Sequence, residues 1–247
     1  MRAMSWIGTV ESLWRYPVKS MRGEELDEVF AGYSGIKGDR LFAFNSSASR
    51  KEFPYFTGRD QRQMLRFRPR YRRPNQDCTS ANELTIDVET PAGDTVAIDD
   101  PALIDRLRLG LESKHELTLM RSDRALTDCH PVSIISLQTV RTLGEETGLT
   151  LDKRRFRANV YLDLTAADGF AEDAFVGRSI RIGPTAIVSI VKRDGRCMMI
   201  TLDPDTAEKE PALLKTVAQA HEGMAGVYGT VKVEGILRRG DSVELLD

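Results

Sequence analysis

The chain has 247 residues, of which 41% are hydrophobic and 29% charged, a composition that is typical of an ordinary globular protein and excludes a disordered or fibrous one. Its 35 Lys and Arg residues against 37 Asp and Glu give a net charge of −2, so no global field favours nucleic acid or a membrane as a partner.

The first half of the chain predicts mainly β structure, because short segments of strand character alternate with turn residues. Pro17 interrupts the first strand with a loop. A short helix is expected at 101–109, with Asp99-Asp100 as its cap and Pro101 in its first turn. The expected strands of this half are 6–13, 26–31, 40–45, 84–89, 95–98 and 117–120.

The second half mixes strands with helices. Ser136 is the expected N-cap of a helix at 137–146 that ends at Gly148, and an amphipathic helix is expected at 211–221. The whole chain is therefore predicted to be α+β and rich in strands, without a flexible linker between its halves. The expected strands of this half are 132–135, 156–164, 179–182, 186–192, 227–233 and 242–246.

The three cysteines, Cys78, Cys129 and Cys197, are scattered and odd in number. Their spacing matches no zinc motif and argues against a disulfide framework. The start of the chain lacks a long apolar region, and no run reaches the length that spans a bilayer. We therefore expect a cytoplasmic protein in a reducing compartment, without a membrane partner.

Cys197 stands in the segment that says most about function. Gly195 and Arg196 form an expected turn that delivers the thiol at the start of an apolar run, and the Asp-Pro-Asp-Thr sequence at 203–206 closes that run. A thiolate is a soft ligand suited to a redox metal or to sulfur chemistry. The neighbouring Arg can hold an anion and lower the thiol pKa. The alternative interpretation is a buried structural cysteine.

Three loops bring basic side chains next to glycine or a hydroxyl group. Lys19 and Ser20 lie in a proline-restrained loop, where the ammonium and the hydroxyl suit a phosphate. Segments 38–40 and 57–59 each place an Arg beside a glycine. Each loop alone predicts only a surface ion pair, but the three together indicate an anionic, phosphorylated ligand.

Two longer basic runs have a structural interpretation. The run at 66–73 alternates Arg with apolar residues, as in a strand with one solvated face, and the net charge argues against nucleic acid as a partner. The run at 153–157 leads into an expected strand that would place Arg157 and Asn159 on one face. Such a short pattern is usually structural.

Asp128, Cys129 and His130 directly precede an expected buried strand. Carboxylate, thiol and imidazole groups suit acid–base work or metal binding, although an Asp before a Pro-containing segment is commonly a turn residue. Ser136 and His221 are interpreted as helix-terminal residues. A Ser/His/Asp hydrolase, a dinucleotide-binding fold and a Walker loop are not supported, because the chain lacks their glycine motifs.

Taken in order, these segments resemble the molybdenum cofactor sulfurase C-terminal (MOSC) superfamily with its N-terminal β-barrel region. The layout is closest to the amidoxime-reducing components of mitochondria and their bacterial relatives. The resemblance implies an N-terminal β-barrel-like region at 1–122 and a MOSC β-barrel domain with a few helices at 123–247. The segments that carry it are 13–23, 38–40, 56–60, 128–132, 155–159, 195–197 and 202–206.

The resemblance also implies a molybdopterin-bound molybdenum, the molybdenum cofactor, with Cys197 as the metal ligand. Asp128 would deliver protons or orient water or substrate at the metal. The implied reaction is the two-electron reduction of an N-hydroxylated small molecule, R–NHOH to R–NH2 and water. The implied cofactor contacts are Lys19, Ser20, Arg40, Thr57 and Arg59 in the first half, and Arg157, Asn159, Gly195, Arg196 and Thr201 in the second.

A separate electron-transfer protein is the expected redox partner, because three scattered cysteines cannot hold an iron–sulfur cluster. The chain departs from the family at Gly195, where relatives commonly have Ser, and at 205–207, where a Thr-Gly ending is usual. Pyridoxal phosphate binding is associated only with the superfamily as a whole. Two alternatives stay open: a sulfur carrier or sulfurtransferase with a persulfide on Cys197, and a carrier that holds the cofactor without turnover.

Overall fold

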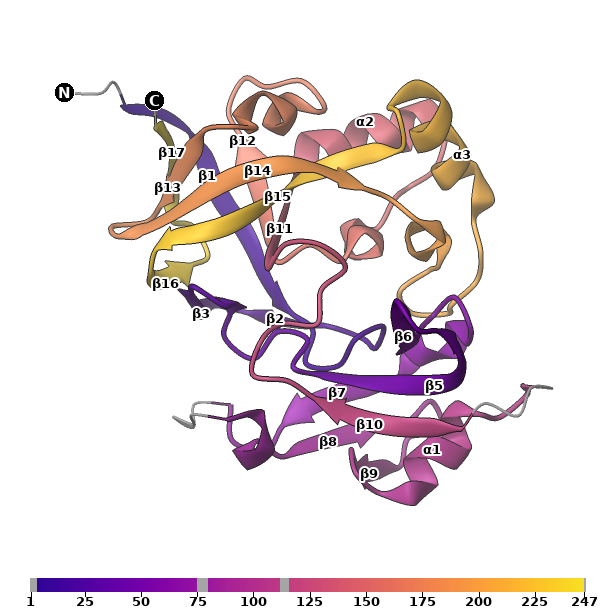
Figure 1. Ribbon diagram of the computed structural model, residues 1–247. Helices are drawn as coiled ribbons and strands as arrows, with labels where there is room; N and C mark the ends of the chain where they lie inside the picture. The colour runs from indigo at the N-terminus through magenta and orange to yellow at the C-terminus, as the bar shows by residue number, and fades with distance from the viewer. Residues whose placement is uncertain (1–3, 75–79, 112–115, 247) are drawn as a thin grey trace.

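A computed structural model describes residues 4–74, 80–111 and 116–246 of the chain. Its largest element is a sheet in the order β12-β11-β15-β14-β13-β17-β1-β2, in which pairing of β1 with β12 closes seven strands into a barrel (Figure 1). All neighbouring barrel strands are antiparallel except β11 and β12, which are parallel. The strands are β1 (Met4–Arg15), β2 (Glu24–Leu26), β11 (Val132–Ser136), β12 (Val160–Leu164), β13 (Ser179–Ile182), β14 (Ala186–Gly195), β15 (Met224–Val233) and β17 (Ser242–Leu246).

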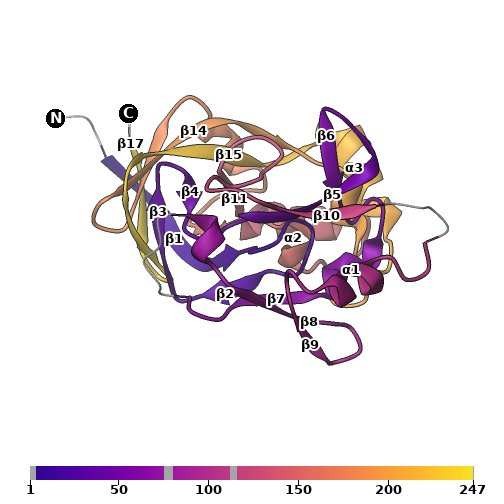
Figure 2. The ribbon, with the colours of Figure 1, turned by 60° about the horizontal axis from the view of Figure 1, so that its bottom comes forward.

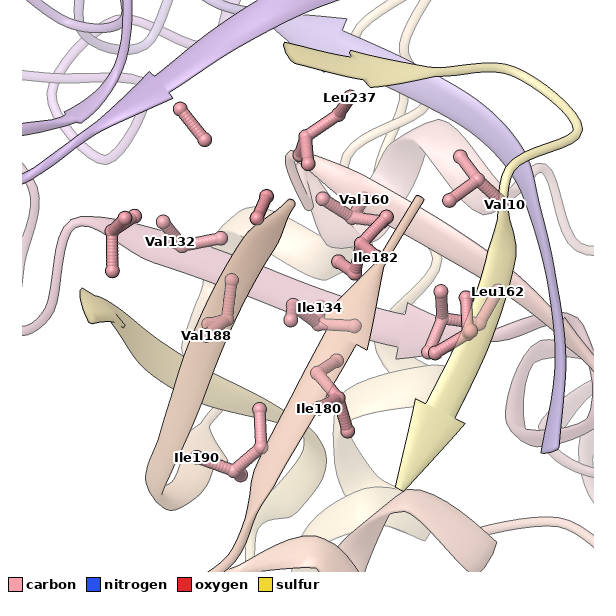
Figure 3. Packing of buried hydrophobic residues seen from close by; sticks show 14 of the residues in the cluster. Val10, Val132, Ile134, Val160, Leu162, Ile180, Ile182, Val188, Ile190 and Leu237 are labelled. Carbon is pink, nitrogen blue, oxygen red and sulfur yellow. The ribbon is translucent and has the colours of Figure 1, made fainter. Parts of the chain in front are cut away.

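The barrel interior is filled by aliphatic side chains that alternate with outward-facing residues along each strand. In Figure 3, Ile134 of β11 lies among side chains of the facing strands, and Leu237 lies near one end of this core. Each of these side chains is fully buried, and burial of one Val, Leu or Ile contributes roughly 1.5–3 kcal/mol. The predicted β-rich α+β class is confirmed.

Strand β1 comes from the start of the chain but completes the barrel that the second half builds. It pairs with β12 along one edge and with β17 along the other, so that Met4 lies opposite Leu246. The start of β1 and the end of β17 therefore lie side by side (Figures 1 and 2). A short sheet in the order β16-β3-β4 packs against β1, β14 and β15, away from the Met4–Leu246 pair (Figure 1). Its strands are β3 (Glu28–Gly32), β4 (Gly35–Ile36) and β16 (Gly235–Arg238).

The remaining N-terminal residues form two three-stranded sheets and a short helix below the barrel in Figure 1. They share a second core, in which Phe42, Phe44 and Phe56 pack with Leu103 and Leu107. The elements are β5 (Phe42–Arg50), β6 (Phe53–Phe56), β7 (Arg68–Tyr71), β8 (Ile86–Glu89), β9 (Thr95–Ala97), β10 (Leu117–Arg121) and α1 (Pro101–Leu107). The basic run at 66–73 contains β7, whose Arg68 and Arg70 are exposed while Pro69 and Tyr71 are buried, so its interpretation as a strand with one solvated face is confirmed.

Two helices cover the outside of the barrel, α2 (Leu137–Thr147) and α3 (Pro211–Ala220). The Ser136 hydroxyl accepts a hydrogen bond from Thr139 N at 3.1 Å, and Gly148 ends α2 with φ of 69°. Both predicted helix signals are thus confirmed. None of the helices in the described part of the chain is long and apolar enough to cross a membrane.

The prediction of a strand from residue 156 is wrong over its first four residues. Asp152 caps a 3-10 helix at Lys153–Phe156, and Arg157 follows in the left-handed region with φ of 53°. Strand β12 therefore begins only at Val160. Arg157 and Asn159 do not share a strand face, because the tight turn redirects the chain between them. The expected strand at 26–31 corresponds to β3, and strands β2, β4, β6 and β16 were not predicted.

Candidate functional site

A cleft lies where the N-terminal loops meet one end of the barrel. It contains about 760 Å³ of empty space, counting the part that is open to solvent. Thr201 does not line it, because its hydroxyl donates to Met198 O at 2.7 Å within the 3-10 helix Met198–Thr201. The predicted site residues that do line it are Lys19, Ser20, Arg40, Thr57, Arg59, Asp128, Arg157, Asn159, Gly195, Arg196 and Cys197.

Cys197 stands between β14 and the 3-10 helix Met198–Thr201. Strand β14 extends to Gly195, with an irregularity in its pairing to β15 between Arg193 and Gly195, so the thiol follows a strand end rather than the expected turn. It is free and partly exposed, which disfavours the interpretation as a buried structural cysteine. The Arg59 side chain, from the N-terminal half, lies near this thiol: burial lowers the pKa of Arg59, but Cys197 and Asp128 outweigh that effect and raise it.

Asp128 is held by two cations of the N-terminal half. Lys19 Nζ donates to Asp128 Oδ1 and, at 2.7 Å, to Leu126 O, while Arg59 Nη2 lies 3.5 Å from Asp128 Oδ2. Burial raises the pKa of Asp128, but the positive charges of Lys19 and Arg59 outweigh it and leave this pKa below its usual value. Burial lowers the pKa of Lys19, and Asp128 partly offsets that effect. Asp128 is therefore a carboxylate at neutral pH.

Arg157 offers the cleft a cationic group that is not fully paired. Its guanidinium lies over the Tyr16 ring, 4.4 Å from the ring centroid, and Arg40 lies over the same ring at 4.6 Å. Burial, reinforced by the positive charge of Arg40, lowers the pKa of Arg157 to about 10, so the group stays charged. Its Nη2 is buried and has no hydrogen-bond partner. Buried donors are almost always paired, so this one indicates a place for an anion.

Two predicted contact residues are already engaged with the backbone. Asn159 Nδ2 donates to Trp14 O at 3.2 Å, and its Oδ1 accepts from Ser133 N at 3.1 Å. Arg196 donates from Nε to Ala225 O at 2.7 Å and from Nη1 to Phe156 O at 2.8 Å. Both side chains hold the cleft walls together.

Backbone strain is concentrated at this cleft. Among the described residues other than glycine, seven have a positive φ, and three of these line the cleft: Ser20 at 64°, Arg40 at 49° and Arg157 at 53°. Such conformations cost roughly 1–3 kcal/mol each and persist only where the surroundings impose them. The hydrogen bond from Arg40 Nη2 to Arg157 O, at 2.8 Å, joins two of these residues.

The lining residues that the sequence analysis missed include Ser133, Asp194 and Tyr228. Asp194 is only 1% exposed, accepts a hydrogen bond from Ser133 Oγ at 2.9 Å and lies 3.0 Å from Arg196 Nη2. Burial raises the pKa of Asp194, and Arg196 opposes that effect. The sequence offered a signal only for Ser133, which is a polar residue between the apolar Val132 and Ile134 of an expected buried strand.

Gly195 has room for a larger side chain. A Cβ there would meet only Met224 Sδ, at 3.7 Å, whereas a Cβ at Gly235 would come within 2.9 Å of the backbone nitrogen of Ala186. We expect Gly195→Ser to change the free energy of unfolding by less than about 0.5 kcal/mol, and Gly235→Ser to cost about 1–3 kcal/mol by overpacking. Denaturant unfolding of both variants is the measurement, and equal losses would contradict the open space at Gly195.

The fold and the cleft define a class: a barrel protein in which one thiol and several cationic groups from both halves of the chain meet. Residues 121–244 match the MOSC domain family, and residues 7–111 match the MOSC N-terminal beta barrel domain. The chain belongs to the MOSC domain family.

The mitochondrial amidoxime reducing component 2 of Bos taurus is 25% identical over 289 aligned residues, which cover 98% of this chain and 84% of that protein. The YUAD protein of Bacillus subtilis has a similar solved fold, with a TM-score of 0.52 at 14% identity over 100% of this chain and 99% of that one. The similarity to the YUAD protein is a similarity of fold alone.

Proposed function

We propose that the protein is an oxidoreductase that binds the molybdenum cofactor and reduces N-hydroxylated compounds with electrons from a separate protein. The observation that carries the proposal is the free thiol of Cys197 in a cleft that is also lined by Arg157, whose buried Nη2 has no hydrogen-bond partner. The name of the bovine relative, an amidoxime reducing component, supports the same reaction class.

The residues of the cleft fit such a cofactor. Among the described residues, no group of three or more His, Cys, Asp or Glu could hold a metal by itself. A molybdenum at Cys197 therefore suits a cofactor that brings its own sulfur ligands. Arg157, Lys19 and Ser20 would hold the anionic part of that cofactor. When bound, the cofactor supplies the two-electron redox chemistry.

Asp128 orients the substrate instead of donating a proton. The reaction R–NHOH + 2 e⁻ + 2 H⁺ → R–NH2 + H2O consumes two protons, and a carboxylate whose pKa lies below its usual value carries none at neutral pH. Lys19 and Arg59 fix the position of this carboxylate, which accepts hydrogen bonds from an N–H or O–H group. The open cleft lets water supply the protons.

Arg157→Gln is expected to weaken cofactor retention by about 10- to 100-fold, because a charge-assisted hydrogen bond contributes roughly 1.5–3 kcal/mol. Arg70→Gln is the matched control, since Arg70 is exposed on β7 and does not line the cleft. The pterin content per chain after extensive dialysis measures cofactor retention in both variants. Equal retention in the two variants would contradict the role of Arg157.

The proposal is tested by the molybdenum and pterin content per chain after expression in a host that makes the cofactor. Near-stoichiometric metal, followed by reduction of an N-hydroxylated compound with an artificial electron donor, is the expected result. Retention of the cofactor without reduction by any donor would instead indicate a carrier without turnover.

Sulfur carriage is the second candidate function. The partly exposed Cys197 thiol beside Arg59 also suits a persulfide, because a nearby cation favours a reactive thiolate. A protein without molybdenum from a competent host, with a mass increase of one sulfur atom on Cys197, would favour this function over the reductase.

A further inference from the structure

A smaller cavity shares part of its wall with the cleft. It contains about 320 Å³ of empty space, counting the part that is open to solvent. Arg155 and Arg157 line both spaces, so this short segment stands between the cavity and the cleft. We call the smaller space the arginine cavity. Its lining residues are Trp14, Tyr16, Arg22, Gly23, Leu65, Arg154, Arg155, Arg157 and Pro204.

The carboxylates that pair with these arginines do not line the cavity. Arg22 forms an ion pair with Asp205, and Arg154 Nη2 lies 2.6 Å from the same carboxylate. Arg155 Nη2 donates to Asp203 Oδ2 at 3.0 Å. None of the described residues that line the cavity is acidic. The arginines therefore bring positive charge to the cavity wall without a countercharge there.

Three guanidinium nitrogens of these arginines are buried and have no hydrogen-bond partner among the described residues. They are Arg22 Nε, Arg155 Nε and Arg157 Nη2. Buried N–H groups in proteins almost always have a partner. Three such donors in residues that line one cavity indicate a ligand that accepts hydrogen bonds.

The charge balance favours an anion over a water molecule as this ligand. No ion pair joins Arg157 to a carboxylate of the described residues, and burial lowers its pKa to about 10. Burial also lowers the pKa of Arg22, and the positive charges of Arg68 and Arg154 add to that effect. Four arginines thus face three carboxylates, and one more negative charge would balance them, as is usual for buried charges. The three carboxylates are Asp152, Asp203 and Asp205.

The size of the cavity limits this anion to a small one. Its empty space is less than half that of the cleft, at the lower end of the range for small-molecule pockets. Apolar side chains, among them Trp14 and Leu65, occupy the rest of the wall. We propose that the arginine cavity binds a small monovalent anion, such as chloride, through Arg22, Arg155 and Arg157. This inference goes beyond the proposed function and does not depend on it.

The shared wall couples the arginine cavity to the cleft. An anion in the cavity offsets the charge of Arg157 and so weakens its attraction for an anionic ligand in the cleft. The effect is reciprocal, because a coupling free energy between two binding sites acts equally in both directions. The concentration of the small anion should therefore modulate how firmly the cleft holds an anionic ligand.

Tryptophan fluorescence can test the proposal, because Trp14 lines the arginine cavity and the chain has only one other tryptophan, Trp6. Trp6 is 54% exposed and Trp14 is 9% exposed. Trp6→Phe therefore removes the exposed fluorophore and leaves Trp14 as the reporter. Bromide, which quenches an indole that it contacts, is titrated into this variant at constant ionic strength, with gluconate as the bulky replacement anion. Acrylamide, a neutral quencher, reports the general accessibility of Trp14.

Bromide quenching of Trp6→Phe should saturate, and chloride should compete with bromide better than sulfate does. Arg22→Gln in this background should raise the half-saturating bromide concentration by at least about 10-fold, because a charge-assisted hydrogen bond is lost. Arg66→Gln is the matched control, since Arg66 is exposed beside Leu65 and does not line the cavity. It should leave the bromide titration unchanged, and acrylamide quenching should be equal in all three proteins.

Bromide quenching that rises without saturation, or an equal shift in Arg22→Gln and Arg66→Gln, would overturn the inference. Sulfate that competes as well as chloride would contradict a monovalent site. Saturable quenching that disappears in cofactor-loaded protein would show that the cavity is part of the cofactor site and not a separate one. Should Arg22→Gln fail to fold, the bromide titration of Trp6→Phe with the two competing anions decides the question by itself.

Discussion

Cys197→Ala is expected to abolish molybdenum retention while leaving the fold intact. In the proposed function the thiol is the soft metal ligand of the cleft, and the described residues include no group of three or more His, Cys, Asp or Glu that could hold the metal in its place. The side chain is partly exposed, so its loss leaves no large cavity in the core. Metal analysis and pterin fluorescence per chain, beside thermal unfolding, give both readouts.

Cys129→Ala is the matched control for this variant, because Cys129 is also a free thiol but is exposed and does not line the cleft. It should retain molybdenum as wild type does. Normal metal content in Cys197→Ala would contradict the ligand assignment. Loss of metal in both variants, with lowered thermal stability, would point to a general effect of cysteine removal.

Local signals predicted the helices well, because helix ends depend on a few adjacent residues. Asp100 and Ser136 cap α1 and α2 as expected, and Gly148 ends α2 in the left-handed region. Closure of the barrel, in contrast to the helix ends, depends on residues that are far apart in the sequence. The pairing of β1 with β12 joins segments about 150 residues apart, and no local pattern specifies it.

The chain order of the motifs identified most residues of the cleft but not what their side chains do. Arg196 was expected to contact the cofactor, and its Nε and Nη1 donate to backbone carbonyls. The turn at Arg157 was predicted as a strand, because its left-handed conformation depends on contacts with Arg40 and Tyr16 that are distant in sequence. Tyr228 was missed since a tyrosine within a strand carries no functional signal by itself.

Asp128→Asn is expected to retain molybdenum and to lower kcat by about 10²-fold, the range for loss of a group that orients a reacting molecule. Asparagine keeps the shape but loses the charge that Lys19 and Arg59 hold in place. Cofactor content and steady-state kinetics on the same preparation separate binding from turnover. Full activity in this variant would reduce Asp128 to a structural turn residue.

The pH dependence of kcat distinguishes orientation from proton donation by Asp128. Its pKa is lowered in the folded protein, so the carboxylate is ionised throughout the neutral range. Activity that depends on this charge should be lost only as the pH falls below about 4, the ordinary value for Asp. Wild type and Asp128→Asn should therefore have profiles of the same shape between about pH 5 and 9. An inflection within that range that disappears in Asp128→Asn would show that Asp128 is the proton donor, because only a carboxyl group with a raised pKa titrates there.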